Sequence, residues 1–126
     1  MVSIKQRFPG HARQAAYVTA QCQAAAGHLG RYVVVVDDDI DPSNLANVVW
    51  ALGTRTNPEK DIELLRNTYS SALDPVYPKG AKKFFGSRAV IDAYRPYDWI
   101  EDFPRVAESS QAEKQKVLKK WKELFG

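Results

Sequence analysis

The segment Tyr32–Val36 most constrains the fold, because it is an unbroken run of β-branched and aromatic residues. A strand with one face in water alternates apolar and polar residues, whereas this run has no polar position. It therefore predicts a strand covered on both faces, as in a parallel sheet with helices on each side. Four aspartates follow at the carboxyl end of this strand, where ligands of open α/β sheets commonly bind: Asp37, Asp38, Asp39 and Asp41.

An amphipathic helix is expected directly after the aspartates, with Asp41 as its N-cap and Pro42 in its first turn. Its expected inner face has apolar residues at the i, i+3, i+4 and i+7 positions: Leu45, Val48, Val49 and Leu52. A second apolar stripe on the same helix contains Ala46, Trp50 and Gly53. Two stripes indicate that a second face is covered too, either by the 67–83 loop or by a partner, since Trp is favoured in interface cores.

The remaining pattern predicts one α/β domain over residues 1–126, with a small, mainly parallel sheet of about four strands flanked by helices. The other expected strands are 2–6, 61–65 and 87–93, and the other expected helices are 11–26 and a C-terminal helix within 109–126. Ser110 and Glu113 have the spacing of a capping box at the start of that last helix. Its apolar stripe, expected to dock on another surface, is Val117, Leu118, Trp121 and Phe125.

Composition excludes several classes of protein. No apolar run approaches the roughly 20 residues that span a bilayer, and the N-terminus has no apolar signal-peptide core. A single cysteine, Cys22, excludes an internal disulfide, so a reducing cytoplasm is the expected location. The net charge of +3 belongs to residues 111–126, which hold five Lys and two Glu, while the rest of the chain is neutral. We therefore expect neither nucleic acid nor a membrane as a partner.

Few residues suggest local chemistry. The strand-end aspartates could hold Mg²⁺, but neighbours on an extended chain point to opposite faces, so local roles in capping and solvation are favoured over a metal site. The turn that contains Arg7, Gly10 and His11 is a weak candidate for binding an anion at the start of a helix. It lacks the spacing of known phosphate-binding motifs. We expect no catalytic, cofactor-binding or metal-binding residue in this chain.

Three stretches together resemble the C-terminal region of UbiD-type decarboxylases. They are VSIKQRFPGHARQAA (2–16), VVVVDDDIDPSNLANVVWALGTRTNPEKDIELL (33–65), and SALDP (71–75) with AVIDAYRP (89–96). The order and the spacing match that family over about residues 2–100, and the VDDDIDP signature followed by VxWAL and TR is specific to it.

The resemblance implies a role in assembly. UbiD-type enzymes reversibly decarboxylate aromatic or α,β-unsaturated acids with prenylated flavin mononucleotide. The resemblance implies that this cofactor, its metal ions and the Glu-Arg-Glu catalytic set belong to a preceding or partner portion, so no residue here takes over those roles. It also implies that the C-terminal domain drives dimerisation and helps to cover the active-site cleft.

Two hypotheses from different classes follow. In the first, the chain is the C-terminal assembly domain or small subunit of a UbiD-type (de)carboxylase, with Ala46, Trp50, Gly53, Trp121 and Phe125 as interface candidates. Its expected partners are a second copy and a large cofactor-binding portion. In the second, it is a free-standing α/β module that binds Mg²⁺ at the acidic strand end or an anion at a helix N-terminus.

Overall fold

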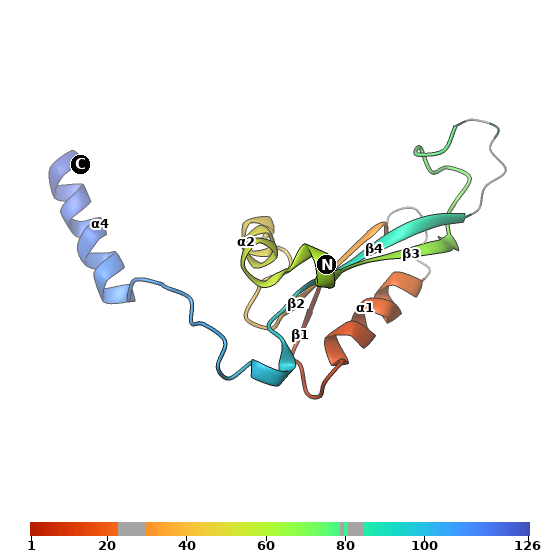
Figure 1. Cartoon of the computed structure of the whole chain (residues 1–126). Coiled ribbons are helices and arrows are strands. Elements are labelled where there is room, and N and C mark those ends of the chain that lie inside the picture. The colour runs from red at the N-terminus through yellow and green to blue at the C-terminus, as the bar shows by residue number, and fades with distance from the viewer. Residues whose placement is uncertain (23–29, 79, 81–84) are drawn as a thin grey trace.

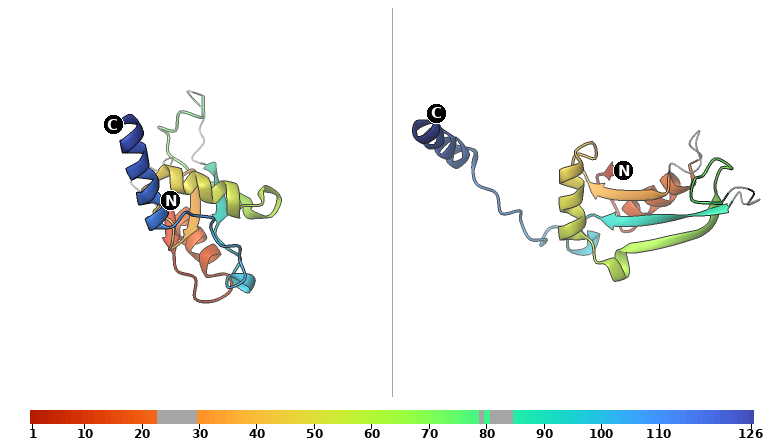
Figure 2. Two further views of the ribbon diagram at one scale, coloured as in Figure 1. Left: turned by 90° about the vertical axis from the view of Figure 1, so that its left-hand side faces the viewer. Right: turned by 90° about the horizontal axis from the view of Figure 1, so that it is seen from above.

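The computed structural model describes residues 1–22, 30–78, 80 and 85–126. A sheet forms the middle layer, with α1 (His11–Gln21) against one face and α2 (Leu45–Arg55) against the other (Figure 1). The C-terminal helix α4 (Gln111–Phe125) stands apart from these layers at the end of an extended segment, as Figure 2 shows from two further directions. The helix α1 ends at Gln21 with Cys22 as an extended C-cap, earlier than the expected end, and the rest of the expected helix 11–26 falls on residues that lie outside the described part.

The sheet has four strands in the order β1-β2-β4-β3. The strands β1 (Val2–Ile4), β2 (Tyr32–Asp37) and β4 (Phe85–Ala93) are parallel, while β3 (Ile62–Tyr69) pairs antiparallel with β4. The prediction of a mainly parallel sheet between helices is therefore confirmed. A short helix, α3 (Pro58–Asp61), leads into β3, and a 3-10 turn (Tyr97–Trp99) follows β4.

Both faces of β2 are buried, as the apolar run predicts. Val33 and Val35 pack with three alanines of α1, so the small side chains bring this helix close to the sheet. Val34 and Val36 point to the other face and pack with Val48 and Ala51 of α2. The strand therefore contributes alternate residues to two separate apolar clusters, one on each side of the sheet.

The start of α2 differs from the prediction. Asn44, not Asp41, is the N-cap, because its side chain accepts hydrogen bonds from the backbone N–H groups of Ala46 and Asn47. The Asp41 carboxylate instead accepts from the backbone and the hydroxyl of Ser43, which closes a turn before the helix. At the other end the helix continues to Arg55, so Gly53 lies within it, as its place in the second stripe requires.

The inner face of α2 was predicted wrongly, because the helix is rotated about its own axis relative to the predicted orientation. Val48 is buried and Leu52 is half-buried, but Leu45 and Val49 are 66% and 57% exposed. The buried face consists of Val48, Ala51, Leu52 and Arg55, which again follow the i, i+3, i+4, i+7 spacing. The physical reason is the charged Arg55, which turns toward the sheet although a hydrophobicity pattern places it outside.

Two backbone features shape the remaining connections. Gly10 has φ of 83° as the N-cap of α1, in the left-handed region that favours glycine, and this confirms the predicted turn before the helix. Asn67 has φ of 57° at an irregularity in the pairing of β3 with β4, and β3 continues past it to Tyr69. The predicted loop therefore starts later than residue 67. Within the described residues, no helix combines the length and the apolar character needed to cross a bilayer.

The two-sided burial of β2 gives a stability prediction. Replacing Val36 with Ala removes buried methyl groups from a fully enclosed site, so we expect the free energy of unfolding to fall by roughly 2 kcal/mol. The matched change at the exposed Val18 of α1 should stay within about 0.5 kcal/mol of the parent. Urea denaturation followed by circular dichroism measures both, and equal effects would contradict the burial pattern.

Candidate functional site

A buried ion pair lies at the carboxyl end of β2. Asp37 is the last residue of the strand and Arg55 the last residue of α2, and each side chain is only 2% exposed. Arg55 Nη1 donates to Asp37 Oδ2 at 2.9 Å. Because a buried charge without a partner is very costly, this pair fixes the end of α2 against the sheet.

Three further side chains complete this cluster. The same Arg55 guanidinium holds both carboxylate oxygens of Asp39, at 2.8 and 2.7 Å. Arg95 donates to Asp37 Oδ2 through its backbone N–H at 2.8 Å and through Nε at 3.0 Å, and Gln6 donates to Asp37 Oδ1. The hydrogen bonds from Arg55 lower the pKa of the Asp39 carboxyl below its ordinary value. The arginines therefore orient both carboxylates, and they favour the ionised form of Asp39.

These contacts decide what the acidic strand end offers to a ligand. Asp37 and Asp39 turn toward Arg55 and Arg95, while Asp41 binds the following Ser43. Among the described residues, no group of three or more His, Cys, Asp or Glu side chains is placed to hold a metal ion. The guanidinium groups of Arg55 and Arg95 are engaged by Asp37 and Asp39, so this cluster does not offer them to the phosphate of a flavin mononucleotide.

A second polar cluster lies on the α1 side of the sheet. Asp92 of β4 is buried, forms an ion pair with Arg13 and accepts a hydrogen bond from the Tyr94 hydroxyl at 2.9 Å. Arg13 also binds Glu63 of β3 at 2.9 Å, and the Tyr17 hydroxyl donates to the same carboxylate at 2.6 Å. Burial raises the pKa of the Asp92 carboxyl and, together with that carboxyl, the pKa of Tyr94. The cluster ties α1 to the strands β3 and β4.

The predicted anion-binding turn brings Arg7, Gly10 and His11 together at the start of α1. The His11 ring stacks on the Phe8 ring, with centroids 4.3 Å apart. The backbone N–H of His11 donates a hydrogen bond to the Phe8 carbonyl. The Arg7 carbonyl accepts a hydrogen bond from the Tyr97 hydroxyl at 3.1 Å. These contacts give the residues structural roles in closing the turn, and anion binding there stays a prediction.

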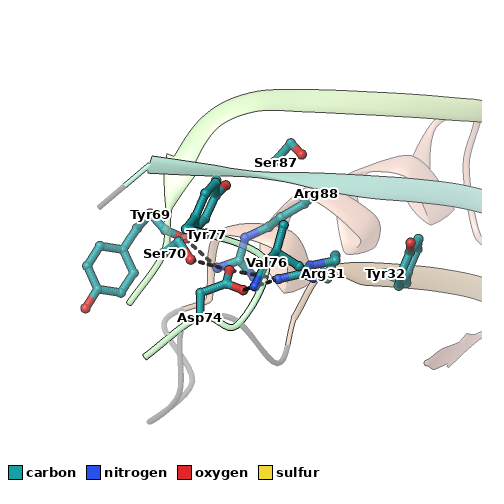
Figure 3. Close-up of a pocket in the computed structure, with 10 residues that line it drawn as sticks. Arg31, Tyr32, Tyr69, Ser70, Asp74, Val76, Tyr77, Ser87 and Arg88 are labelled. Carbon is teal, nitrogen blue, oxygen red and sulfur yellow. Dashed lines mark hydrogen bonds and ion pairs between the residues drawn. The ribbon is translucent and has the colours of Figure 1, made fainter. Parts of the chain in front are cut away.

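A hollow of about 260 Å³ lies at the opposite end of the strands. Figure 3 shows the residues that line it, with Asp74 among polar side chains. Arg31 Nη2 donates to both oxygens of Asp74, at 2.6 and 2.7 Å, and the Ser70 hydroxyl donates to one of them. Arg88 donates to the carbonyls of Gly30 and Tyr69. Both oxygens of the Asp74 carboxylate thus accept hydrogen bonds from the chain itself. These contacts hold the segment around Asp74 against the start of β2.

The outward face of α2 is the other notable surface. Arg55 places its guanidinium 5.2 Å from the centre of the Trp50 ring, and Trp50 remains 39% exposed. Two hollows of about 560 and 330 Å³ flank this ring. Their other side is formed by residues 103–108, which we call the strap. Ala46 lines the larger hollow, and Gly53 is exposed with open space where a Cβ would lie.

The remaining two interface candidates lie on α4, away from the other three. The Trp121 and Phe125 rings contact each other, with centroids 4.4 Å apart, and are 61% and 70% exposed. The predicted capping box is present, since Ser110 and Glu113 each accept from the other's backbone N–H. The helix α4 therefore has a defined start but leaves its apolar side chains uncovered within the described chain.

Sequence reasoning missed the arginines that organise both ends of the sheet. Arg55 and Arg95 reach Asp37 from 18 and 58 residues away, and Arg31 reaches Asp74 across 43 residues. No periodicity signals such distant pairs. A usable sign was the placement of an arginine at the end of an apolar helix next to several aspartates, since charges near a core need partners.

The Asp37–Arg55 pair gives a prediction with a matched control. Replacing Arg55 with Leu leaves a buried carboxylate short of its main partner, and should lower the free energy of unfolding by roughly 3 kcal/mol. Replacing the exposed Arg66 with Leu removes the same charge from the surface and should cost less than about 0.5 kcal/mol. Denaturant unfolding of both variants measures this, and a tolerated Arg55→Leu would refute the structural role.

The Figure 3 cluster gives a pH prediction. The Arg31 guanidinium lowers the pKa of Asp74 to about 2. A lowered pKa in the folded state stabilises the fold above the ordinary value of 3.8, and this contribution is lost as the pH falls toward 2. Titration of the Asp74 carboxyl by NMR should show this value. In an Arg31→Gln variant the pKa should rise toward 3.8, and an unchanged pKa would contradict the assignment.

Comparison with known proteins identifies the family of this chain. The family model of the 3-octaprenyl-4-hydroxybenzoate carboxy-lyase C-terminal domain matches residues 1–93. A phenolic acid decarboxylase of Sedimentibacter hydroxybenzoicus is 34% identical over 97 residues, which are 76% of this chain and 19% of the relative. An uncharacterised protein of Aquifex aeolicus is 30% identical over 126 residues, 98% of this chain and 25% of the relative.

Solved structures agree with this relationship. The vanillic acid decarboxylase of Sedimentibacter hydroxybenzoicus, in its open form, superposes with a TM-score of 0.66 at 28% identity, covering 99% of this chain and 26% of that one. The UbiD-class enzyme HmfF of Pelotomaculum thermopropionicum, in complex with FMN, shares the fold with a TM-score of 0.69 at 24% identity, over 89% of this chain and 24% of that one. The chain thus spans at most about a quarter of these relatives, and it belongs to the family of the 3-octaprenyl-4-hydroxybenzoate carboxy-lyase C-terminal domain, the C-terminal domain of the UbiD-class decarboxylases.

Proposed function

We propose that this chain, as one α/β domain, is the C-terminal assembly domain or small subunit of a UbiD-type (de)carboxylase. In this role it mediates dimerisation and helps to cover the active-site cleft of a larger cofactor-binding portion. The substrate of the whole enzyme is an aromatic or α,β-unsaturated carboxylic acid, and its prenylated flavin and metal ions are held by the larger portion. The cytoplasm is the proposed location.

Family membership and chain coverage support the division of labour. The relatives are about four to five times longer than the matched region, so most of each relative has no counterpart here. Related structures are named as vanillic acid and 3,4-dihydroxybenzoic acid decarboxylases, and an evolved dimeric form of HmfF is in complex with prFMN. Those names favour an aromatic acid as the substrate of the complete enzyme.

The observation that carries the assembly role is the outward face of α2. Its exposed apolar residues and glycine form a band about 140° wide, at 100° per residue: Leu45, Val49, Gly53, Ala46 and Trp50. The opposite side of the helix is packed on the sheet and includes Arg55, and the other polar residues, Asn47 and Thr54, lie in a narrow strip between the two sides. A helix that is apolar nearly all round is normally buried in the functional assembly, and a second copy of the chain supplies that cover in the proposed dimer.

The test of the cofactor claim uses the chain in its native cells. A tagged chain purified from them should elute with a larger polypeptide and with flavin absorbance, whereas the purified chain alone should have no flavin absorbance and no decarboxylase activity. Activity or bound flavin in the chain alone would overturn the division of labour. Elution of this chain without any larger polypeptide would overturn the subunit role.

The test of dimerisation uses the isolated full chain. Light scattering should give twice the 14.2 kDa of one chain. Replacing the exposed Val49 with Asp puts a charge into the apolar band, and should yield a folded monomer by raising the dimer dissociation constant at least about 30-fold.

The matched control replaces Val18, an exposed valine on the surface of α1, with Asp. This change introduces the same charge on the other face of the sheet and should leave the dimer intact. Circular dichroism should show both variants folded. A monomeric parent chain, or equal loss of dimer in both variants, would contradict dimerisation through α2.

A further inference from the structure

The polar cluster on the α1 side of the sheet contains more carboxylates than positive charges. Arg13 of α1 donates to Glu63 of β3 at 2.9 Å and pairs with Asp92 of β4 through its other terminal nitrogen. Asp61, at the end of α3, is a third acidic side chain whose charge acts on Asp92. One guanidinium therefore faces three carboxyl groups, and the two tyrosine hydroxyls of the cluster donate hydrogen bonds without adding positive charge.

Among these three carboxyl groups, that of Asp92 lies deepest in the interior. Its side chain is 5% exposed, against 43% for Glu63, while Asp61 is half-buried. Arg13 and the Tyr94 hydroxyl both bind its Oδ2. The other oxygen, Oδ1, is buried and has no hydrogen-bond partner among the described residues. A buried carboxylate is tolerated when its oxygens are hydrogen-bonded, so the charge of Asp92 is incompletely compensated.

Asp37 on the neighbouring strand β2 provides the contrast. It is buried as deeply as Asp92, with 1% and 4% of the two residues exposed. Gln6 donates to Oδ1 of Asp37, while Arg55 and Arg95 donate to its Oδ2, so both of its oxygens are hydrogen-bonded. The two aspartates therefore differ in how their charge is compensated and not in how deeply they are buried.

A proton is the ligand that such a carboxyl group can take up without a cavity, because it neutralises the buried charge in place. Burial raises the pKa of the Asp92 carboxyl, and the charges of Asp61 and Glu63 also raise it. The Tyr94 hydroxyl and the Arg13 guanidinium act in the opposite direction, since they favour the ionised form. The groups that face Asp92 thus come from α1, α3, β3 and the residues after β4.

We propose that Asp92 is a proton-binding site that controls how α1 is held to the sheet. When Asp92 is ionised, Arg13 is shared between Asp92 and Glu63 and so bridges β4 and β3. When Asp92 takes up a proton, its attraction for Arg13 weakens, and the guanidinium pairs with Glu63, which also accepts from the Tyr17 hydroxyl. The attachment of α1 then moves from the inner strand β4 toward the edge strand β3 (Figure 1).

The uptake of this proton stabilises the fold. Because the pKa of Asp92 is raised in the folded state, the folded chain binds the proton more tightly than the unfolded chain does. The stabilisation is fully present below the ordinary value of 3.8 and is lost as the pH rises through the folded-state value. Asp74 responds in the opposite way, since its contribution is lost as the pH falls. The two carboxyl groups therefore have opposed effects on stability in acid.

NMR titration of the full-length chain tests the site directly. The carboxyl carbon of Asp92 should titrate with a midpoint above 3.8, and the guanidinium signals of Arg13 should change with the same midpoint. A Glu63→Gln variant removes a negative charge near Asp92 and should lower this midpoint, whereas Glu123→Gln, at an exposed position of α4, should leave it unchanged. A midpoint at or below 3.8, or Arg13 signals that do not follow it, would overturn the proposal.

Urea unfolding of the parent and an Asp92→Asn variant at a series of pH values measures the effect on stability. The parent should gain stability relative to the variant as the pH falls, because only the parent can take up the proton, while the other carboxyl groups are common to both chains. A difference that does not change with pH refutes the site. Should the variant fail to fold, the NMR midpoint of the parent decides alone. Neither measurement uses a partner or a cofactor, so a failure here leaves the proposed function standing.

Discussion

The buried pair of Asp37 and Arg55 is the interaction on which the arrangement of this fold depends. Two charges in the interior are tolerated only when each is well paired, and here the arginine satisfies Asp39 as well while Arg95 adds two further donors. The pair fixes the rotation of α2 about its own axis. Because the arginine takes a place on the buried side, apolar residues that periodicity assigns to the core, Leu45 among them, face outward.

The sequence predicted the features that depend on neighbouring residues. The unbroken run of β2 predicted burial on both faces, and Ser110 with Glu113 predicted the capping box of α4, because each signal is complete within a few positions. The N-cap of α2 was misassigned because Asp41 and Asn44 both suit such a position, and only the three-dimensional turn through Ser43 decides between them. The antiparallel direction of β3 likewise depends on distant pairing.

The candidate surfaces also differ in whether neighbouring residues or distant partners determine them. The sequence showed that α2 has more apolar residues than one buried face accommodates and that α4 has an apolar stripe, although it assigned Leu45 and Val49 to the wrong face of α2. The acidic strand end could not be interpreted in this way. Its carboxylates look available as ligands until Arg55 and Arg95 are placed beside them, and those partners come from other elements of the fold. Charge pairing across the fold therefore decided the role of Asp37 and Asp39.

The separation of the interior into two apolar clusters has a consequence for how such a domain can change over time. Val33 and Val35 belong to the α1 layer, whereas Val34 and Val36 belong to the α2 layer, with the backbone of β2 between them. Substitutions in one layer should leave the packing of the other largely untouched, since the two clusters have no member in common among the described residues. Lineages can thus acquire a new quaternary arrangement by altering one side of the sheet, while the other preserves the thermodynamic robustness of the scaffold.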